Sequence, residues 1–437
     1  MRFSSVLRQD LFHDYPETFA QLQASPSLPS GVLADADDCS VDDLLAESIG
    51  ADLEAISEES RAGVVTLDRI TRTTLDRLEG LPSLQRISFT DEKTTVLPKE
   101  IVALERLRVL ELSLTRKFKR LHKNLGLATE LEALLLINLH NLTDISILTR
   151  LSKLSHIVFS NTIKLKDYTP LQQLASLRHL TLASLDLDDA APVAATLTNL
   201  TTLDLKSSIR SWTVPAVVTL IESLPNLSAL GLASADLSFG ALPPLDHIEQ
   251  LDLYSLDGLA PGMFSRATRL KALSLQFYSA DALPDHLGDL AALEALDLSF
   301  ARTLHDDTDF SALAGLSSLQ YLDLSQQEAL RRVPDAISSL TALRQINLAG
   351  RTITEISALR GLPMLRCASL QGVKDEAHLV EVVMALPALE RVEVASHIDI
   401  RKLADHPSLK LILGPRPAPA SVADRFDLKH SAAFLRR

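Results

Sequence analysis

The chain has 437 residues, of which 46% are hydrophobic and only 4% aromatic. This apolar fraction excludes a disordered chain, and the scarcity of aromatic residues predicts a core of aliphatic side chains. The two cysteines, Cys39 and Cys367, are too few for a disulfide framework, which favours a reducing, cytoplasmic location. No apolar run approaches the roughly 18 residues of a membrane span, and Arg8 and Asp10 interrupt any secretory core at the N-terminus.

The net charge of −13 is concentrated at one end of the chain. Residues 1–60 contain thirteen acidic and two basic residues, whereas the remainder is nearly balanced. A nucleic-acid-binding protein needs a basic face, and the composition indicates none. The sequence therefore predicts neither a nucleic-acid partner nor a membrane partner.

The N-terminal segment is predicted to contain an arm followed by a cap. Residues 1–40 include Pro26, Pro29 and Gly31 and are interpreted as an arm and linker. Residues 41–83 are expected to hold a capping helix at 41–59 and a degenerate first repeat with a strand near Val64–Leu67. One apolar stripe at helical spacing supports the helix, namely Leu44, Leu45, Ile49, Leu53 and Ile56. The alternative is that this acidic stretch is a solvated arm.

A leucine pattern then repeats along residues 84–413. Its form is Leu-x-x-Leu-x-Leu, as in Leu293, Leu296 and Leu298. The copies begin at residues 84, 107, 131, 154, 177, 200, 227, 248, 270, 293, 319, 343, 365, 389 and 409. The intervals of 20 to 27 residues average about 23, a period typical of solenoid proteins.

These copies resemble the leucine-rich repeat family, and the resemblance covers roughly residues 84–413. Second halves such as Leu97-Pro98-x-x-Ile101-x-x-Leu104 resemble cytoplasmic repeats of plant and bacterial proteins, including bacterial effectors. The family's asparagine at the ninth position is replaced here, for example by Thr162, Gln327 and Arg351, and the flanking cysteine caps of extracellular members are missing. The first departure puts regular curvature in doubt, and the second favours an intracellular protein.

The expected fold is an α/β solenoid, a horseshoe of about 15 repeats with a parallel β-sheet on the concave face and helical or 3₁₀ segments on the convex face. A strand that turns its leucines to one side cannot bury them alone, so stacked neighbours must share the core. Two copies are long, 200–226 with Trp212 and 293–318, and their extra residues are either binding loops or drift in length. Residues 414–437, which begin Gly-Pro-Arg-Pro, are interpreted as a C-terminal tail.

If the leucines point inward, the third, fifth and seventh residues of each copy face solvent on the concave side. The fifth residues include Asp204, Asp252, Asp297 and Asp323, with no lysine or arginine in the column. Tyr254 and Tyr321 lie in flanking columns. This acidic stripe predicts a protein partner with a basic surface, while the alternative is that the aspartates are ordinary repeat consensus.

The first repeats differ, because apolar residues map to the same face. Leu135, Ile137 and Val158 form a patch that is predicted either to bind a partner or to be covered by residues 1–30. His156 and His179 fall in one column of adjacent copies and are expected about 5 Å apart. Two ligands are too few for a zinc site, so we expect polar surface histidines and no metal. Cys367 has no histidine nearby on this map and is interpreted as an ordinary cysteine.

The sequence predicts a protein that is not an enzyme and needs no cofactor. No phosphate-binding loop, nucleophile motif or metal-ligand cluster is recognisable, and the chain outside the repeats is short for a catalytic domain. The first functional hypothesis is a non-catalytic scaffold that binds a protein partner on the concave face. The alternatives are a bacterial secreted effector that acts on a host protein through its repeats, and a ubiquitin-transfer adaptor, because Val41-Asp42-Asp43-Leu44-Leu45 faintly resembles an F-box.

Overall fold

The computed structural model describes two compact units, whose boundary falls between Gly231 and Leu232. The described residues are 123–183, 189–205, 214–233, 245–254, 261–395, 397–403 and 405–413, together with 64–67, 86–89, 101, 104, 107–113, 119–121 and 259. The expected arm, capping helix and tail, at residues 1–40, 41–59 and 414–437, lie outside them, as does Trp212.

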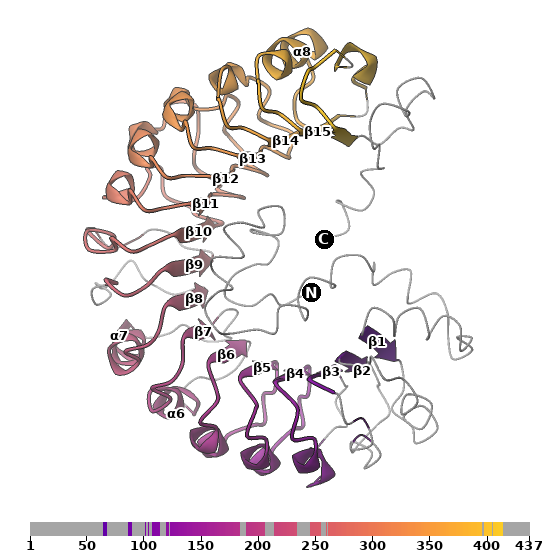
Figure 1. The fold of residues 1–437 in the computed structure, drawn as a ribbon. Helices are drawn as coiled ribbons and strands as arrows, with labels where there is room; N and C mark the ends of the chain where they lie inside the picture. The colour runs from indigo at the N-terminus through magenta and orange to yellow at the C-terminus, as the bar shows by residue number, and fades with distance from the viewer. Residues whose placement is uncertain are drawn as a thin grey trace, which may run out of the picture. The chain divides into compact units, whose positions relative to one another are not determined.

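In the first unit, parallel strands follow one another in chain order (Figure 1). They are β1 (Val64–Leu67), β2 (Arg86–Phe89), β3 (Val109–Ser113), β4 (Ala133–Ile137), β5 (His156–Ser160), β6 (His179–Ala183), β7 (Thr202–Leu205) and β8 (Ala229–Ala233), which crosses the boundary. Pairing between β1 and β7 is in register, so equivalent residues of consecutive copies lie side by side. β1 lies where the degenerate first repeat was expected.

The second unit repeats this arrangement. Its strands are β9 (Gln250–Tyr254), β10 (Ala272–Gln276), β11 (Ala295–Asp297), β12 (Tyr321–Asp323), β13 (Gln345–Asn347), β14 (Cys367–Leu370), β15 (Arg391–Val394) and β16 (Leu411–Leu413). Each pairs in parallel with the next, again with copies in register. From β2 to β16, every strand begins two residues after the first leucine or isoleucine of a copy, so the predicted solenoid is confirmed.

The repeated leucines form the core. In the copy that starts at Leu293, the side chains of Leu293, Leu296 and Leu298 are completely buried, and the other described copies follow the same pattern. A single strand could not shield these side chains, so each copy depends on its neighbours for burial.

The chain returns from strand to strand through short helical segments on the opposite edge of each unit (Figure 1). The 3₁₀ segments are η3 (Lys123–Leu127), η4 (Ser146–Arg150), η5 (Thr169–Gln173), η7 (Leu287–Asp289), η8 (Ser311–Gly315), η9 (Asp335–Ser339), η10 (Ser357–Leu359) and η11 (Ile400–Leu403). The α-helices are α6 (Ala191–Ala194), α7 (Val214–Ser223) and α8 (Glu376–Met384). α7 lies within the long copy 200–226, so part of that copy's extra length is helical.

Ion pairs between consecutive copies add to this stacking. Lys153 pairs with Glu130, Lys166 with Asp189 and Lys271 with Glu249, at distances of 2.6 to 2.9 Å. The cation of each pair is exposed, so screening by water keeps the contribution of each pair to stability small. The buried leucines therefore dominate the stability of the array.

Candidate protein-binding surface

The face of the sheet opposite the leucine core carries the predicted site residues. We call it the open face and define it by the third, fifth and seventh residues of each copy. In-register pairing places these residues in rows across the strands. Neighbouring residues of any surface on this face therefore come from consecutive strands rather than from a single strand.

The acidic residues on this face are enclosed rather than exposed. Asp204, Asp252 and Asp297 each keep 1% of their accessible surface, and Asp323 keeps 7%. The expectation of a solvent-facing acidic stripe at these positions is therefore wrong. Tyr321 is also buried, at 4%, while the side chain of Tyr254 lies outside the described residues.

Hydrogen bonds between copies explain how buried carboxylates are tolerated. Asp297 accepts from Gln276 Nε2 at 2.5 Å, from Ser274 Oγ at 3.3 Å and from the backbone N–H of Ser299 at 2.7 Å. These donors come from the preceding copy and from Asp297's own strand end. A carboxylate with several donors can be buried without being left unsatisfied.

Asp323 has an equivalent set of partners. Its carboxylate accepts from the Ser325 N–H at 2.7 Å, Asn347 Nδ2 at 2.8 Å and the Tyr321 hydroxyl at 3.1 Å. Burial, and then the charge of Asp297 on the adjacent strand, raises the pKa of Asp323 to about 6. In the following copies Ser369 Oγ donates to Glu393 at 2.8 Å, which continues the polar network. We call Ser274, Asp297, Asp323, Asn347, Ser369 and Glu393 the polar column.

His156 and His179 lie in paired positions on β5 and β6, as their shared column predicts. The expectation of surface histidines is wrong for His156, which keeps only 9% of its accessible surface. Their rings stack with centroids 4.0 Å apart and an angle of 6° between planes. The lone pairs of parallel rings lie in separate planes, so the two imidazoles cannot both coordinate one metal ion in this arrangement. In the described part of the chain, no group of three or more metal-ligating side chains lies close enough to hold an ion.

The protonation state of His156 follows from its partners. Ser155 Oγ donates to the Glu132 carbonyl at 3.2 Å and bonds to His156 Nδ1 at 2.7 Å, an arrangement in which Nδ1 carries the ring proton. The Nε2 atom is then an unprotonated acceptor, and it has no hydrogen-bond partner. Burial, with the neighbouring His179, lowers the pKa of His156 to about 2, and burial lowers the pKa of His179 to about 4. Both rings are therefore neutral at physiological pH.

The apolar residues beside these histidines are partly exposed. Leu135, Ile137 and Val158 are half-buried, whereas Ala133 and Thr181 around them are buried. Leu135 and Val158 are direct neighbours across β4 and β5, and Ile137 follows two residues later on β4. The three form one continuous group, which we call the apolar patch.

The sequence reasoning assigned no role to the eighth position of the copies, which lies past the strand. Phe277 and Phe300 occupy it in consecutive copies, with left-handed φ of 56° and 58°, and their rings stack at 4.7 Å. Asn138 and Asn161 occupy the same position in the first unit. An alignment of the eighth residues of the copies would have drawn attention to these two pairs.

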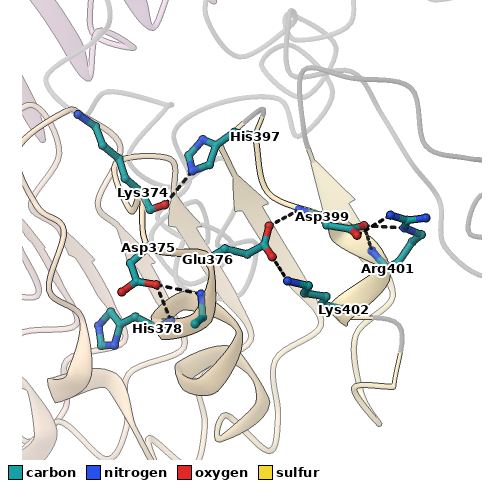
Figure 2. A network of polar contacts seen from close by, with 9 residues as sticks. Lys374, Asp375, Glu376, His378, His397, Asp399, Arg401 and Lys402 are labelled. Atoms are coloured by element: carbon teal, nitrogen blue, oxygen red, sulfur yellow. Dashed lines mark hydrogen bonds and ion pairs between the residues drawn. The ribbon is translucent and has the colours of Figure 1, made fainter.

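The last described copies are held together by a polar network (Figure 2). Asp375 caps α8 by accepting from the N–H groups of Ala377 and His378 at 3.0 and 3.1 Å. Glu376 pairs with Lys402 and accepts from the Asp399 N–H at 3.0 Å. The adjacent Arg401 lowers the pKa of Asp399 to about 2. Asp375, Glu376, Asp399, Arg401 and Lys402 each have a partner within the network, which indicates a structural role.

In comparisons with known proteins, no family model matches the chain. Tsukushi of Gallus gallus is 28% identical over 168 residues, which are 38% of this chain and 45% of that protein, so the match spans less than half of its relative. Among solved structures, a leucine-rich repeat protein of Leptospira interrogans is 20% identical with a TM-score of 0.47, covering 86% of this chain and 91% of that one. An internalin of Listeria monocytogenes is 19% identical with a TM-score of 0.37, covering 83% and 89%.

The assignment rests on this chain's own architecture. Strands recur every 20 to 27 residues, neighbouring strands pair in parallel and in register within each unit, and the repeated leucines are buried. These features give the chain the fold of a leucine-rich repeat solenoid.

Proposed function

We propose that the protein is a non-catalytic scaffold that binds a protein partner through the open face of its first unit. The apolar patch of Leu135, Ile137 and Val158 carries this proposal. These side chains stay half-exposed although neighbouring residues on the same strands are fully buried. Grouped apolar side chains on a protein surface usually mark an interaction site, because a partner would remove them from water.

His156 and His179 extend this surface on one side. His156 lies two residues before Val158 on β5, so both side chains lie on the open face. The stack is neutral and the Nε2 atoms of both rings are buried, so it borders the patch as a mainly apolar neighbour. The proposed contact surface is therefore mainly apolar, with few charges to desolvate.

The predicted acidic contacts have a different place in this proposal. Asp204, Asp252, Asp297, Tyr321 and Asp323 are buried. A partner could pair directly with Asp297 or Asp323 only after breaking existing hydrogen bonds, which costs free energy. We therefore assign these two residues to the rigidity of the face, and a contact through Tyr254 stays a prediction.

A binding role accounts for the surface without any catalytic step. In the described residues, no helix is long and apolar enough to cross a membrane. The effector and ubiquitin-adaptor hypotheses depend on residues 1–60, all of which lie outside the described part. No observation on the repeats favours either of them over a general scaffold.

Site-specific photo-crosslinking tests the proposal. A photoreactive amino acid is placed singly at positions 135, 137 and 158, with Ser152 and Gln173, which are exposed outside the open face, as matched control positions. In cells of the source organism, we expect one discrete adduct with another protein from the patch positions and none from the controls. Mass spectrometry identifies the crosslinked peptide.

Three outcomes can be distinguished. Adducts that are the same from patch and control positions contradict the proposal, as does a lack of adducts from all three patch positions. Crosslinks from the patch to residues 1–30 of the same chain would mean that the chain covers its own patch. That result would also contradict the proposal, and deletion of residues 1–30 would then be required to expose the patch.

A further inference from the structure

The residue that follows the strand has a left-handed backbone in several copies. It is the eighth residue of each copy, and its φ lies between 55° and 58° at Asn138, Asn161, Phe277, Phe300 and Gln326. In each case its N–H donates to a carbonyl of the next copy, as Phe277 does to Ser299 and Phe300 does to Ser325. The repeat geometry therefore imposes this conformation whatever the side chain.

Asparagine suits this conformation, and phenylalanine does not. Asparagine is enriched at positive φ, whereas a bulky residue there is an outlier that costs free energy. The first unit uses the favourable choice, and Asn161 Nδ2 donates to Asn138 Oδ1 at 3.0 Å. The two phenylalanines therefore do not stabilise the left-handed backbone, so we expect their rings to have another role.

The two rings form a small platform. Phe277 and Phe300 stack with centroids 4.7 Å apart and planes 14° apart, and both side chains are half-buried rather than enclosed. The guanidinium of Arg302 lies 5.9 Å from the centre of the Phe277 ring. Strained residues that also expose an apolar group are typical of contact sites, because a partner can compensate for the strain.

The surroundings of the platform are acidic. The two segments that lead away from it, residues 277–290 and 300–310, contain six aspartates and a single arginine. Asp281, Asp285 and Asp307 are exposed, unlike the polar column. The one cation, Arg302, has a carboxylate within 3.9 Å, that of Glu328. The exposed carboxylates of these two segments therefore favour a positively charged partner.

We propose that Phe277 and Phe300 anchor a second binding surface, in the second unit, for a protein segment that carries an apolar side chain next to lysine or arginine. The apolar side chain packs against the exposed edges of the stacked rings. The basic residues face the exposed aspartates of the two flanking segments. This inference rests on the proposed scaffold function but uses a different surface, so the two can fail separately.

A library of random peptides displayed on phage, selected on the full-length protein, tests the inference. We expect enriched peptides to combine apolar with basic residues and to lose at least tenfold in affinity for the variant F277N/F300N. Raised salt should also weaken them, because part of the attraction is between exposed charges. The asparagine pair reproduces Asn138–Asn161, so the variant should fold with a thermal unfolding midpoint no lower than that of the wild type.

Matched variants separate the explanations. Q326N changes the same backbone position in the next copy and should leave peptide affinity unchanged, and so should S152D, at an exposed position of the first unit outside the open face. The proposal is overturned if selection yields no peptide that depends on the two phenylalanines, or if dependent peptides lack basic residues. If F277N/F300N instead lowers the unfolding midpoint and leaves peptide affinity intact, the stack is a structural clamp and the proposal also fails.

Discussion

His156 and His179 stack ring on ring, with centroids 4.0 Å apart, from paired positions on adjacent strands. His156 Nδ1 is bonded to Ser155, and the Nε2 atoms of both rings are buried without a hydrogen-bond partner. Protonating either ring would place a charge in a poorly solvated site beside another imidazole. The pair therefore makes the stability of this region sensitive to acid.

The first prediction concerns this sensitivity. The pKa values of both histidines are lower in the folded protein than the ordinary value of 6.5. Their contribution to stability is complete above pH 6.5 and is lost as the pH falls below it, because the unfolded chain then binds protons that the folded protein does not. At pH 5 each histidine should therefore have lowered the free energy of unfolding by about 2 kcal/mol relative to neutral pH.

Urea unfolding at pH 7.5 and pH 5 measures the effect. The variant H156Q/H179Q should lose less stability on acidification than the wild type does. H286Q, at an exposed histidine, should behave as the wild type. Equal losses in the wild type and H156Q/H179Q would contradict the prediction.

The second prediction concerns the neighbouring carboxylates of β11 and β12. The pKa of Asp323 is raised by burial and by Asp297, so the folded protein holds this proton more tightly than the unfolded chain does. This contribution is favourable at low pH and is lost as the pH rises from about 4 to about 6. D297N removes the repulsion, so its stability relative to the wild type should be more favourable at pH 7 than at pH 4 by roughly 1 kcal/mol.

The test compares the effect of D297N on the free energy of unfolding at pH 7 with its effect at pH 4. The hydrogen bonds that D297N alters are altered at both pH values, so their cost largely cancels in this comparison. Carbon-13 spectra of labelled aspartate should show the Asp323 titration moving to lower pH in the variant. An unchanged Asp323 titration would mean that burial alone raises its pKa.

The third prediction concerns Gln327, which stands where the family has its asparagine. Its Nε2 donates to the Leu298 carbonyl of the previous copy at 2.7 Å, and the side chain is buried. Q327A leaves that carbonyl unsatisfied and should lower the free energy of unfolding by about 1–3 kcal/mol. E328A, at the exposed neighbour, should change it by about 0.5 kcal/mol or less in denaturant unfolding. Equal effects of the two variants would exclude a ladder role for Gln327.

The fourth prediction concerns the close approach of η7 and η8. A Cβ on Gly315 would collide with the backbone of Gly288 in the preceding copy. G315A should therefore destabilise the protein by about 1–3 kcal/mol and speed hydrogen exchange in β11 and β12. G361A has no neighbour within 4 Å and only the cost of its φ of 78°, so exchange in those two strands should stay unchanged. Identical exchange in both variants would contradict the steric explanation.

The strands were predictable because the leucines that repeat along the sequence are the side chains that are buried in the core. Leu293, Leu296 and Leu298 must leave water together, which fixes the strand between them and its register with the next copy. The same reasoning predicted that His156 and His179 lie side by side. Periodicity carries this information because every copy meets an almost identical neighbour.

The accessibility of the open face was not predictable in the same way. Alternation gives the side of the strand on which Asp297 lies, but not that Gln276 and Ser274 of the previous copy would enclose it. Polar side chains can pair with each other as readily as with solvent or a partner, and a column of single residues does not distinguish these cases. The strain at Phe277 is likewise a backbone property that its residue type conceals.

In-register pairing also means that residues can be inserted or deleted without disturbing the sheet only in units of one whole copy. Ser274 lies opposite Asp297, which lies opposite Asp323, so excision of the 26 residues from Leu293 to Ser318 would bring Ser274 opposite Asp323 and Leu273 opposite Leu322. Loss of half that number would turn leucines toward water and carboxylates toward the interior. Duplication or loss of whole copies is therefore the route along which a gene of this kind can diverge while its product still folds.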